Sequence, residues 1–139
     1  MSRQQACGPA EARERRQYAE QQLALAELGD PWSTPAERKA SGGCAVLAGI
    51  AAADAVCCGR LGRRSRGQDH RAALDLLRRV EPDGGQLAKD LETVLADKDV
   101  MQYGTALVTA SRHRRLLRAV RRLVEAARAV AQSGPPPGQ

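Results

Sequence analysis

The stretch CAVLAGIAAADAVCC, residues 44–58, limits the fold of this chain more than any other feature. Asp54 is the one charged position in it, and alanine and leucine are strong helix formers, so we predict a helix that is apolar on nearly every face. Such a helix must be buried on several sides, either among helices of its own chain or against a second subunit. We expect it to offer more apolar surface than a five-helix bundle of this length can cover, and therefore predict a homodimer.

This central helix has a distinct beginning and small residues along its length. The residues STPAE at 33–37 supply a hydroxyl cap and a proline at the first helical position, so the helix is predicted over about 35–59. Gly42, Gly43 and Gly49 lack side chains that would hold a neighbouring helix away. We therefore expect another helix to approach closely at these positions.

The rest of the chain shows the period of amphipathic helices, and no stretch favours a strand. Four further helices are predicted, over residues 9–28, 67–80, 85–99 and 105–132, the last being the longest. Aromatic residues make up only 2% of the chain and none is Phe, so the core is expected to consist of Ala, Leu and Val. The sequence thus predicts an all-α bundle of about five helices over residues 9–132, between disordered ends at 1–8 and 133–139.

The N-terminal sequence and the cysteines bear on the compartment. Residues 1–17 contain no apolar segment typical of a secretory signal, and no run long enough to cross a membrane is predicted, so we expect a cytoplasmic protein without membrane binding. The four cysteines are accordingly expected to be reduced, small apolar residues: Cys7, Cys44, Cys57 and Cys58. A zinc site of Cys57, Cys58 and His70 is an alternative, but paired CxxC or HxxxH spacing is missing, and no metal or other cofactor is predicted.

A short polar motif, KDVMQYG at residues 98–104, lies near the end of the fourth predicted helix. Lys98 and Tyr103 are five positions apart, and we expect them to lie beside one another where the fourth and fifth helices meet. The motif resembles that of the HEPN superfamily of small helical-bundle proteins, in which an Arg, often followed by a polar residue, precedes a His by a short interval. Here Lys98 stands in place of the Arg, Asp99 in place of the polar residue and Tyr103 in place of the His.

The resemblance extends to the alanine-rich stretch around Asp54 and to GQDHRAALDLL at 67–77, and it covers roughly residues 10–131. It implies an up-and-down four-helix core, usually in a dimer whose motif residues line a shared cleft. HEPN proteins are commonly metal-independent ribonucleases, toxins paired with a nucleotidyltransferase, or non-catalytic binders of RNA or nucleotides. The resemblance therefore implies RNA or a nucleotide as ligand, and a bacterial toxin–antitoxin or defence system with a nucleotidyltransferase partner as one setting.

The two substitutions in the motif favour binding over catalysis. A histidine, with a pKa of about 6.5, shuttles protons near neutral pH far better than a tyrosine, with a pKa of about 10. A lysine is a point charge where an arginine would hold a phosphate through two parallel hydrogen bonds. We predict that Lys98, Asp99 and Tyr103 bind RNA or a nucleotide with little or no catalysis. The alternatives are a dimeric protein-interaction module, an active ribonuclease toxin, and a solvated helix end with Tyr103 in the core.

Asp54 and His70 are further candidates for the site. A lone carboxylate costs on the order of several kcal/mol to bury without a partner, so Asp54 should have one. The candidate partners are Arg60, His70, Lys98 and Tyr103. Asp54 and its partner form either a structural salt bridge or part of the site. His70 is either a site residue or a histidine in the capping region of the third helix.

Two arginine-rich segments complete the candidate residues. The net charge is +6, and a basic loop follows the central helix with Arg63, Arg64 and Arg66. On the last predicted helix, one outward face carries Arg115, Arg118 and Arg122. Both segments suit the phosphates of a nucleic acid. The alternative is a solvated face that is neutralised by acidic side chains from other helices.

Overall fold

The computed structural model describes residues 4–66 and 69–133. The helices and strands are β1 (Gln4–Ala6), α1 (Pro9–Glu27), α2 (Pro35–Leu61), β2 (Arg63–Ser65), α3 (His70–Arg78), α4 (Gly84–Gln102) and α5 (Ala110–Gln132). The prediction of an all-α bundle of about five helices is confirmed. Of the predicted tail at 133–139, Ser133 caps the end of α5, and residues 134–139, like residues 1–3, lie outside the described residues.

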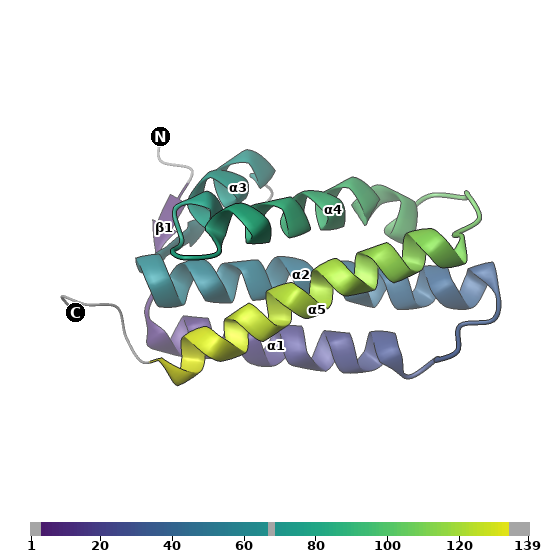
Figure 1. The fold of residues 1–139 in the computed structure, drawn as a ribbon, viewed down its shortest axis with the longest axis horizontal. Helices are drawn as coiled ribbons and strands as arrows, with labels where there is room; N and C mark the ends of the chain where they lie inside the picture. The colour runs from purple at the N-terminus through teal and green to yellow at the C-terminus, as the bar shows by residue number, and fades with distance from the viewer. Residues whose placement is uncertain (1–3, 67–68, 134–139) are drawn as a thin grey trace.

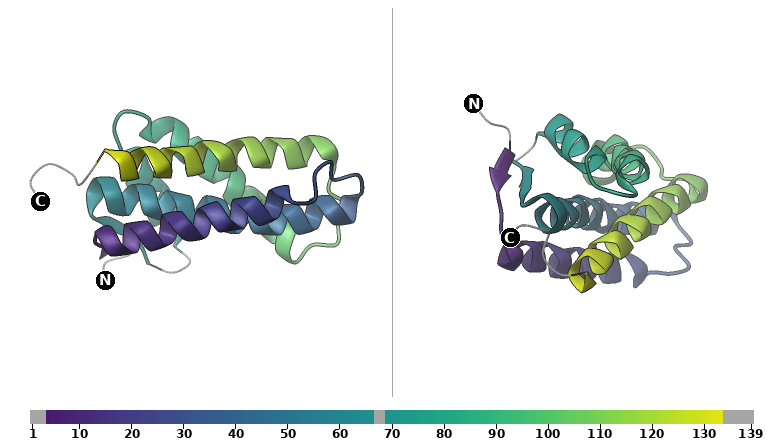
Figure 2. Two further views of the ribbon diagram at one scale, coloured as in Figure 1. Left: turned by 90° about the horizontal axis from the view of Figure 1, so that it is seen from below. Right: turned by 60° about the vertical axis from the view of Figure 1, so that its left-hand side comes forward.

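The four long helices run alternately up and down and pack side by side around one core (Figure 1). α3 is short and lies against the beginning of α4, near the two strands (Figures 1 and 2). Leu76, Leu77, Leu91, Leu116 and Leu117 are among the largest fully buried side chains. The core is therefore aliphatic, as the shortage of aromatic residues predicted.

α2 is the central helix of the bundle. It is 27 residues long, and Thr34 caps it by accepting a hydrogen bond from the Glu37 N–H at 3.1 Å. α2 is long and apolar enough to cross a membrane by length and composition alone, although no run of that length was predicted from the sequence. Most of its apolar positions are buried inside this bundle, as in the core helix of a soluble protein. Because the other helices of the same chain cover it, α2 does not require a second subunit. Homodimerisation stays a prediction without that support.

Two glycines of α2 allow α4 to approach closely, as predicted. A Cβ atom on Gly49 would lie 2.9 Å from Cγ2 of Val94, and one on Gly42 would collide with the side chain of Met101. Gly43 meets only the Met101 backbone oxygen, at an ordinary 3.8 Å. Close packing of α2 on α4 therefore rests on Gly42 and Gly49.

The N-terminal residues differ from the prediction of a disordered segment and of a chain without strands. β1 pairs with β2 in an antiparallel ladder, with Gln4 opposite Ser65 and Ala6 opposite Arg63. Cys7 then forms a disulfide with Cys58 near the end of α2, so the prediction of four reduced cysteines is wrong for this pair. Strands of three residues are too short to show an alternating pattern, and the cysteines lie 51 residues apart, so sequence spacing gave no sign of either contact.

The predicted boundary between the last two helices is also corrected. α4 continues to Gln102, and α5 begins at Ala110, where the Thr109 side chain accepts a hydrogen bond from the Arg112 N–H at 3.1 Å. α5 is 23 residues long, so α2 and not the last helix is the longest. The motif residues and the loop after them therefore lie before α5 begins.

A buried polar cluster joins α2 and α5 to the loop between α1 and α2. Nε2 of His113 lies 2.8 Å from the Ser41 hydroxyl, which donates to the Ala26 carbonyl oxygen at 2.7 Å. The Trp32 ring packs edge-on against His113, with 4.7 Å between ring centroids, and its N–H donates to the same Ala26 oxygen. His113 is 1% exposed, so this cluster is a structural core element without access for a ligand.

We expect acid to destabilise the protein through His113. Burial, reinforced by the charges of Arg38 and Arg121, lowers the pKa of this imidazole below its usual value. As pH falls below about 6.5, this histidine becomes protonated in the unfolded chain but stays neutral in the folded protein. The free energy of unfolding therefore falls by up to about 1.4 kcal/mol for each unit by which folding lowers the pKa of His113. Thermal melts between pH 7 and pH 5 measure this loss. A His113→Asn variant should show a flatter dependence, and an equally steep one would contradict the assignment.

Candidate functional site

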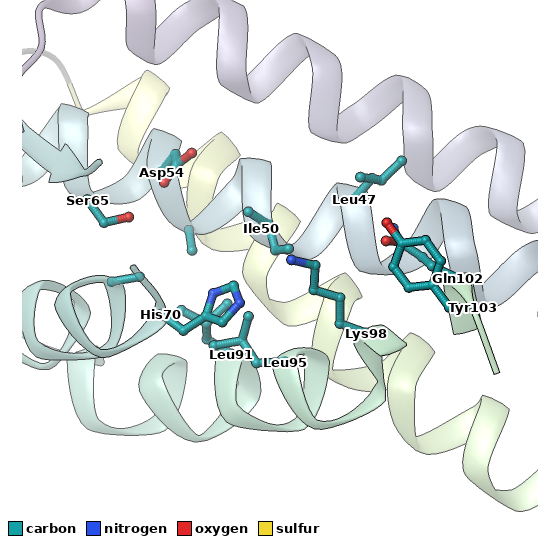
Figure 3. Close-up of a pocket in the computed structure, with 12 residues that line it drawn as sticks. Leu47, Ile50, Asp54, Ser65, His70, Leu91, Leu95, Lys98, Gln102 and Tyr103 are labelled. Carbon is teal, nitrogen blue, oxygen red and sulfur yellow. The ribbon is translucent and has the colours of Figure 1, made fainter. Parts of the chain in front are cut away.

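One cavity of about 220 Å³ brings together four of the polar side chains singled out in the sequence: Asp54, His70, Lys98 and Tyr103. Asp54 and Ser65 lie at one end of it, Gln102 and Tyr103 at the other, and His70 and Lys98 between them (Figure 3). α2, β2, α3 and α4 supply these residues, with Tyr103 directly after α4, whereas α5 supplies none. The site therefore lies between α2 and α4 rather than at the predicted meeting of α4 with α5.

Helical spacing explains how the walls of the cavity form. Leu47, Ile50 and Asp54 follow one another by three and four positions along α2, so they share one face of that helix. On α4 the facing residues are likewise three or four positions apart: Leu91, Leu95, Lys98 and Gln102. Each wall thus has apolar residues followed by a polar one at its end.

Sequence reasoning missed several wall residues. Ile50, Leu91 and Leu95 lie in the apolar stretches of their helices, and they form part of the cavity lining as well as packing in or against the core. Ser65 and Gln102 were not singled out at all. The available signal was the repeated spacing of three and four residues, which ends in Asp54 on α2 and in Lys98 and Gln102 on α4.

Asp54 has a partner, as predicted, but on a different helix from those considered. Nε of Arg15, on α1, lies 3.5 Å from Oδ2 of Asp54. Desolvation by burial nevertheless raises the pKa of Asp54, although the charges of Arg15 and Arg64 act to lower it. The buried Nε atoms of Arg15 and Arg64 have no hydrogen-bond partner among the described residues. Asp54 thus lines this end of the cavity, and next to it, outside the lining, lie two guanidinium groups whose hydrogen bonding is incomplete.

A consequence for stability follows from the raised pKa of Asp54. Above that pKa the folded protein contains a buried charge that the unfolded chain solvates better, so ionised Asp54 reduces the free energy of unfolding at neutral pH. We expect Asp54→Asn, which keeps the shape and one acceptor for Arg15, to raise the melting temperature at pH 7. Calorimetry checks this, with Asp75→Asn on the exposed face of α3 as the control. A lowered melting temperature in Asp54→Asn alone would show that the ion pair outweighs desolvation.

The three motif residues have different environments. Lys98 is half-buried, and its ammonium group points into the middle of the cavity (Figure 3). Tyr103 is 78% exposed at the mouth, so the alternative of a core ring is wrong. Asp99 is exposed and does not line the cavity; its carbonyl oxygen accepts the N–H groups of Tyr103 and Gly104 at the end of α4. The cavity thus unites Lys98 with Tyr103 but leaves Asp99 outside.

His70 satisfies both of the interpretations that the sequence left open. It is the first residue of α3, directly after the N-cap Asp69, whose side chain accepts from the Ala72 N–H at 2.9 Å. It also lines the cavity, between Asp54 and Lys98 (Figure 3). Capping by Asp69 therefore holds His70 where its ring faces the cavity.

The arginines of the basic loop lie around the end of the cavity that Asp54 and Ser65 line, called the inner end below, but they do not line the cavity themselves. Nε of Arg63 donates to the side chain of Gln4 at 3.1 Å, and Nε of Arg64 lies 3.9 Å from Glu11. Arg66 is exposed at the end of the loop. Arg64 thus acts on Asp54 only through its charge.

The arginines of α5 are partly neutralised by acidic residues of other helices. Arg122 makes a bidentate contact with the buried carboxylate of Asp90, and this hydrogen bonding raises the pKa of its guanidinium group. Arg112 and Arg121 pair with Asp97 and Glu27, respectively. In the described part of the chain, Arg115 and Arg118 are exposed and form no ion pair. The predicted stripe is reduced to these two residues and their neighbour Arg114.

Within residues 4–66 and 69–133, no group of acidic, histidine and cysteine side chains is arranged to hold a metal ion. The zinc alternative also loses Cys58, which is bonded to Cys7. Burial raises the pKa of the Cys57 thiol to about 12, so this residue is not a thiolate at neutral pH.

No family model matches this sequence, and no curated protein matches it either. The resemblance to HEPN proteins therefore stays a prediction that rests on the motif, and the helical bundle fits it without testing it. The cavity has to be interpreted from its own chemistry.

Proposed function

We propose that this protein binds a phosphate-bearing ligand, a nucleotide or a nucleotide unit of RNA, in the cavity between α2 and α4. The observation that carries the proposal is that Lys98 and His70 both line the middle part of that cavity (Figure 3). One is a permanent cation and the other becomes cationic when protonated, and both donate hydrogen bonds to phosphate oxygens.

The lining cation and the net charge of the chain support an anionic ligand. Lys98 lines the cavity, whereas Arg15 and Arg64 near Asp54 also lie 3.8 and 3.9 Å from Glu14 and Glu11, respectively, and are partly neutralised by them. The net charge of the whole chain is +6, which attracts anions over longer distances. The other half of the lining is aliphatic, as in small-molecule sites where a few polar groups orient the ligand.

Binding without turnover is the form of this function that the motif favours. Tyr103 replaces the histidine of the motif and lies at the mouth, where it offers a ring to stack on rather than a proton shuttle near neutral pH. Our first proposed function is therefore that of a HEPN-like binding protein with little or no catalysis. A cytoplasmic location, a homodimer and a nucleotidyltransferase partner are further parts of this proposal. The Cys7–Cys58 disulfide is typical of oxidising compartments and speaks against the cytoplasmic part.

Weak RNA cleavage is the second candidate function, and His70 is the observation that favours it. A histidine in the same cavity as Lys98 is able to supply the proton transfer that Tyr103 lacks, while Lys98 offsets the charge that develops on the phosphate. Incubation with a fluorescent RNA tests it, because cleavage should disappear in His70→Ala and persist in Tyr103→Phe.

A comparison of nucleotide binding with nucleoside binding, at low and at high salt, tests the proposal directly. We expect a nucleoside monophosphate to bind and the matching nucleoside to bind at least about tenfold more weakly, since one charge-assisted contact contributes about 1.5–3 kcal/mol. Isothermal titration calorimetry at 50 and 300 mM salt measures both. Equal affinity for the nucleoside and the nucleotide would contradict a phosphate site.

A further inference from the structure

We propose that the cavity selects guanine: Asp54 accepts the N1–H and 2-amino groups of the base, while Lys98 and His70 hold the phosphate of the same nucleotide. This inference rests on the proposed function, because it names the ligand of the same site. The geometry points to it through the order of groups along the cavity, with a carboxylate at the inner end and cations in the middle (Figure 3).

The cavity offers aliphatic side chains on two sides to a flat ring. Ile50 and Ala53 of α2 line one side, and Ala73 of α3 with Leu91 of α4 line the other. Aliphatic walls pack against both faces of a base without forming hydrogen bonds. A volume of about 220 Å³ is below the range of about 300–1,000 Å³ that encloses drug-sized ligands, so one base with its sugar fits better than a strand.

Asp54 stands where the edge of such a ring would end, and an ionised carboxylate only accepts hydrogen bonds. Guanine presents two adjacent donors on its Watson–Crick edge, which match the two oxygens of a carboxylate. Adenine and cytosine each set a ring-nitrogen acceptor beside the amino group, and uracil sets two carbonyl oxygens around its N–H. Those acceptors would face the carboxylate with like partial charge, so guanine alone pairs fully with it.

The state of Asp54 in the free protein agrees with a ligand that donates hydrogen bonds. Burial raises the pKa of this carboxyl group although Arg15 and Arg64 are near, so the carboxylate has fewer donors than its burial requires. The contact with Arg15 is long, at 3.5 Å, and involves Oδ2. Ser65 adds a hydroxyl group at the same end of the cavity, where it is able to donate to the guanine O6 atom.

Calorimetric titrations of the full chain with GMP, IMP, AMP and CMP test the inference. We expect GMP to bind about tenfold or more tightly than AMP or CMP, with IMP between them, because IMP keeps the N1–H but lacks the 2-amino group. Asp54→Asn should reduce GMP affinity to that of AMP, while Lys89→Ala, on the exposed side of α4, should leave all four affinities unchanged.

The outcomes separate this inference from the proposed function. Equal affinity for all four nucleotides, or a GMP preference that survives in Asp54→Asn, overturns guanine selection and leaves the phosphate site standing. Absence of binding by all four overturns both. A second arm titrates the RNA trinucleotide UGU, with UAU as the control that lacks guanine. Tighter binding of UGU than of GMP identifies RNA as the source of the guanine, and weaker binding of UGU than of GMP identifies the free nucleotide.

Discussion

Reversing the charge of Lys98 should abolish nucleotide binding. In Lys98→Glu, two carboxylates would line one small cavity, and the phosphate would meet an anion where it now meets a cation. Losing a partly buried charged contact costs about 2–5 kcal/mol, so we expect affinity for GMP to fall at least about 30-fold. Fluorescence anisotropy or calorimetry measures this change directly.

The matched control is Lys89→Glu. Both lysines lie on α4 and both substitutions change the net charge equally, but Lys89 is exposed and does not line the cavity. Its affinity should fall less than about threefold, in line with long-range electrostatics in salt. If both variants lose affinity equally, attraction by the whole surface and not the cavity explains binding.

Loss of the Cys7–Cys58 disulfide should have the largest effect on stability. The bond closes a loop across a sequence separation of 51 residues, for which chain entropy predicts about 4 kcal/mol of stabilisation. For a chain of this size, that corresponds to a fall in melting temperature of about 10–15 °C. The melting temperature of the protein in a thiol reductant should fall by this amount and should equal that of Cys7→Ser.

Cys44→Ser serves as the control for this prediction, because Cys44 is a free cysteine. Its melting temperature should still fall on addition of reductant, whereas that of Cys7→Ser should not. Mass spectrometry after alkylation counts the free thiols. Four alkylated cysteines in the untreated protein would show that the disulfide is absent.

The helices were predictable because each one carries its own signals. The Thr34 cap and the proline after it placed the beginning of α2 correctly, and the aliphatic period placed the core. The beginning of α5 was less predictable, because the last helix was expected from residue 105 and only the Thr109 cap marks its beginning at Ala110. The sequence thus predicts features that depend on one helix alone, whereas it does not predict the length of the loop between two helices.

The candidate site was only partly predictable, since it depends on contacts between distant segments. Lys98, Tyr103, Asp54 and His70 were singled out for their chemistry, and the cavity unites them. The partner of Asp54 was missed because Arg15 lies on a different helix, 39 positions earlier by residue number. Ser65 was missed because β2 exists only through its pairing with β1 and the disulfide beside it.

An NMR titration of isotope-labelled protein with GMP tests the central claim most directly. If the cavity binds the ligand, the largest amide shifts should cluster at the residues around it, including Asp54, Ser65, His70 and Lys98, and should saturate together. Shifts centred instead on the exposed arginines Arg114, Arg115 and Arg118 of α5, or no saturable shifts at all, would contradict a ligand site between α2 and α4.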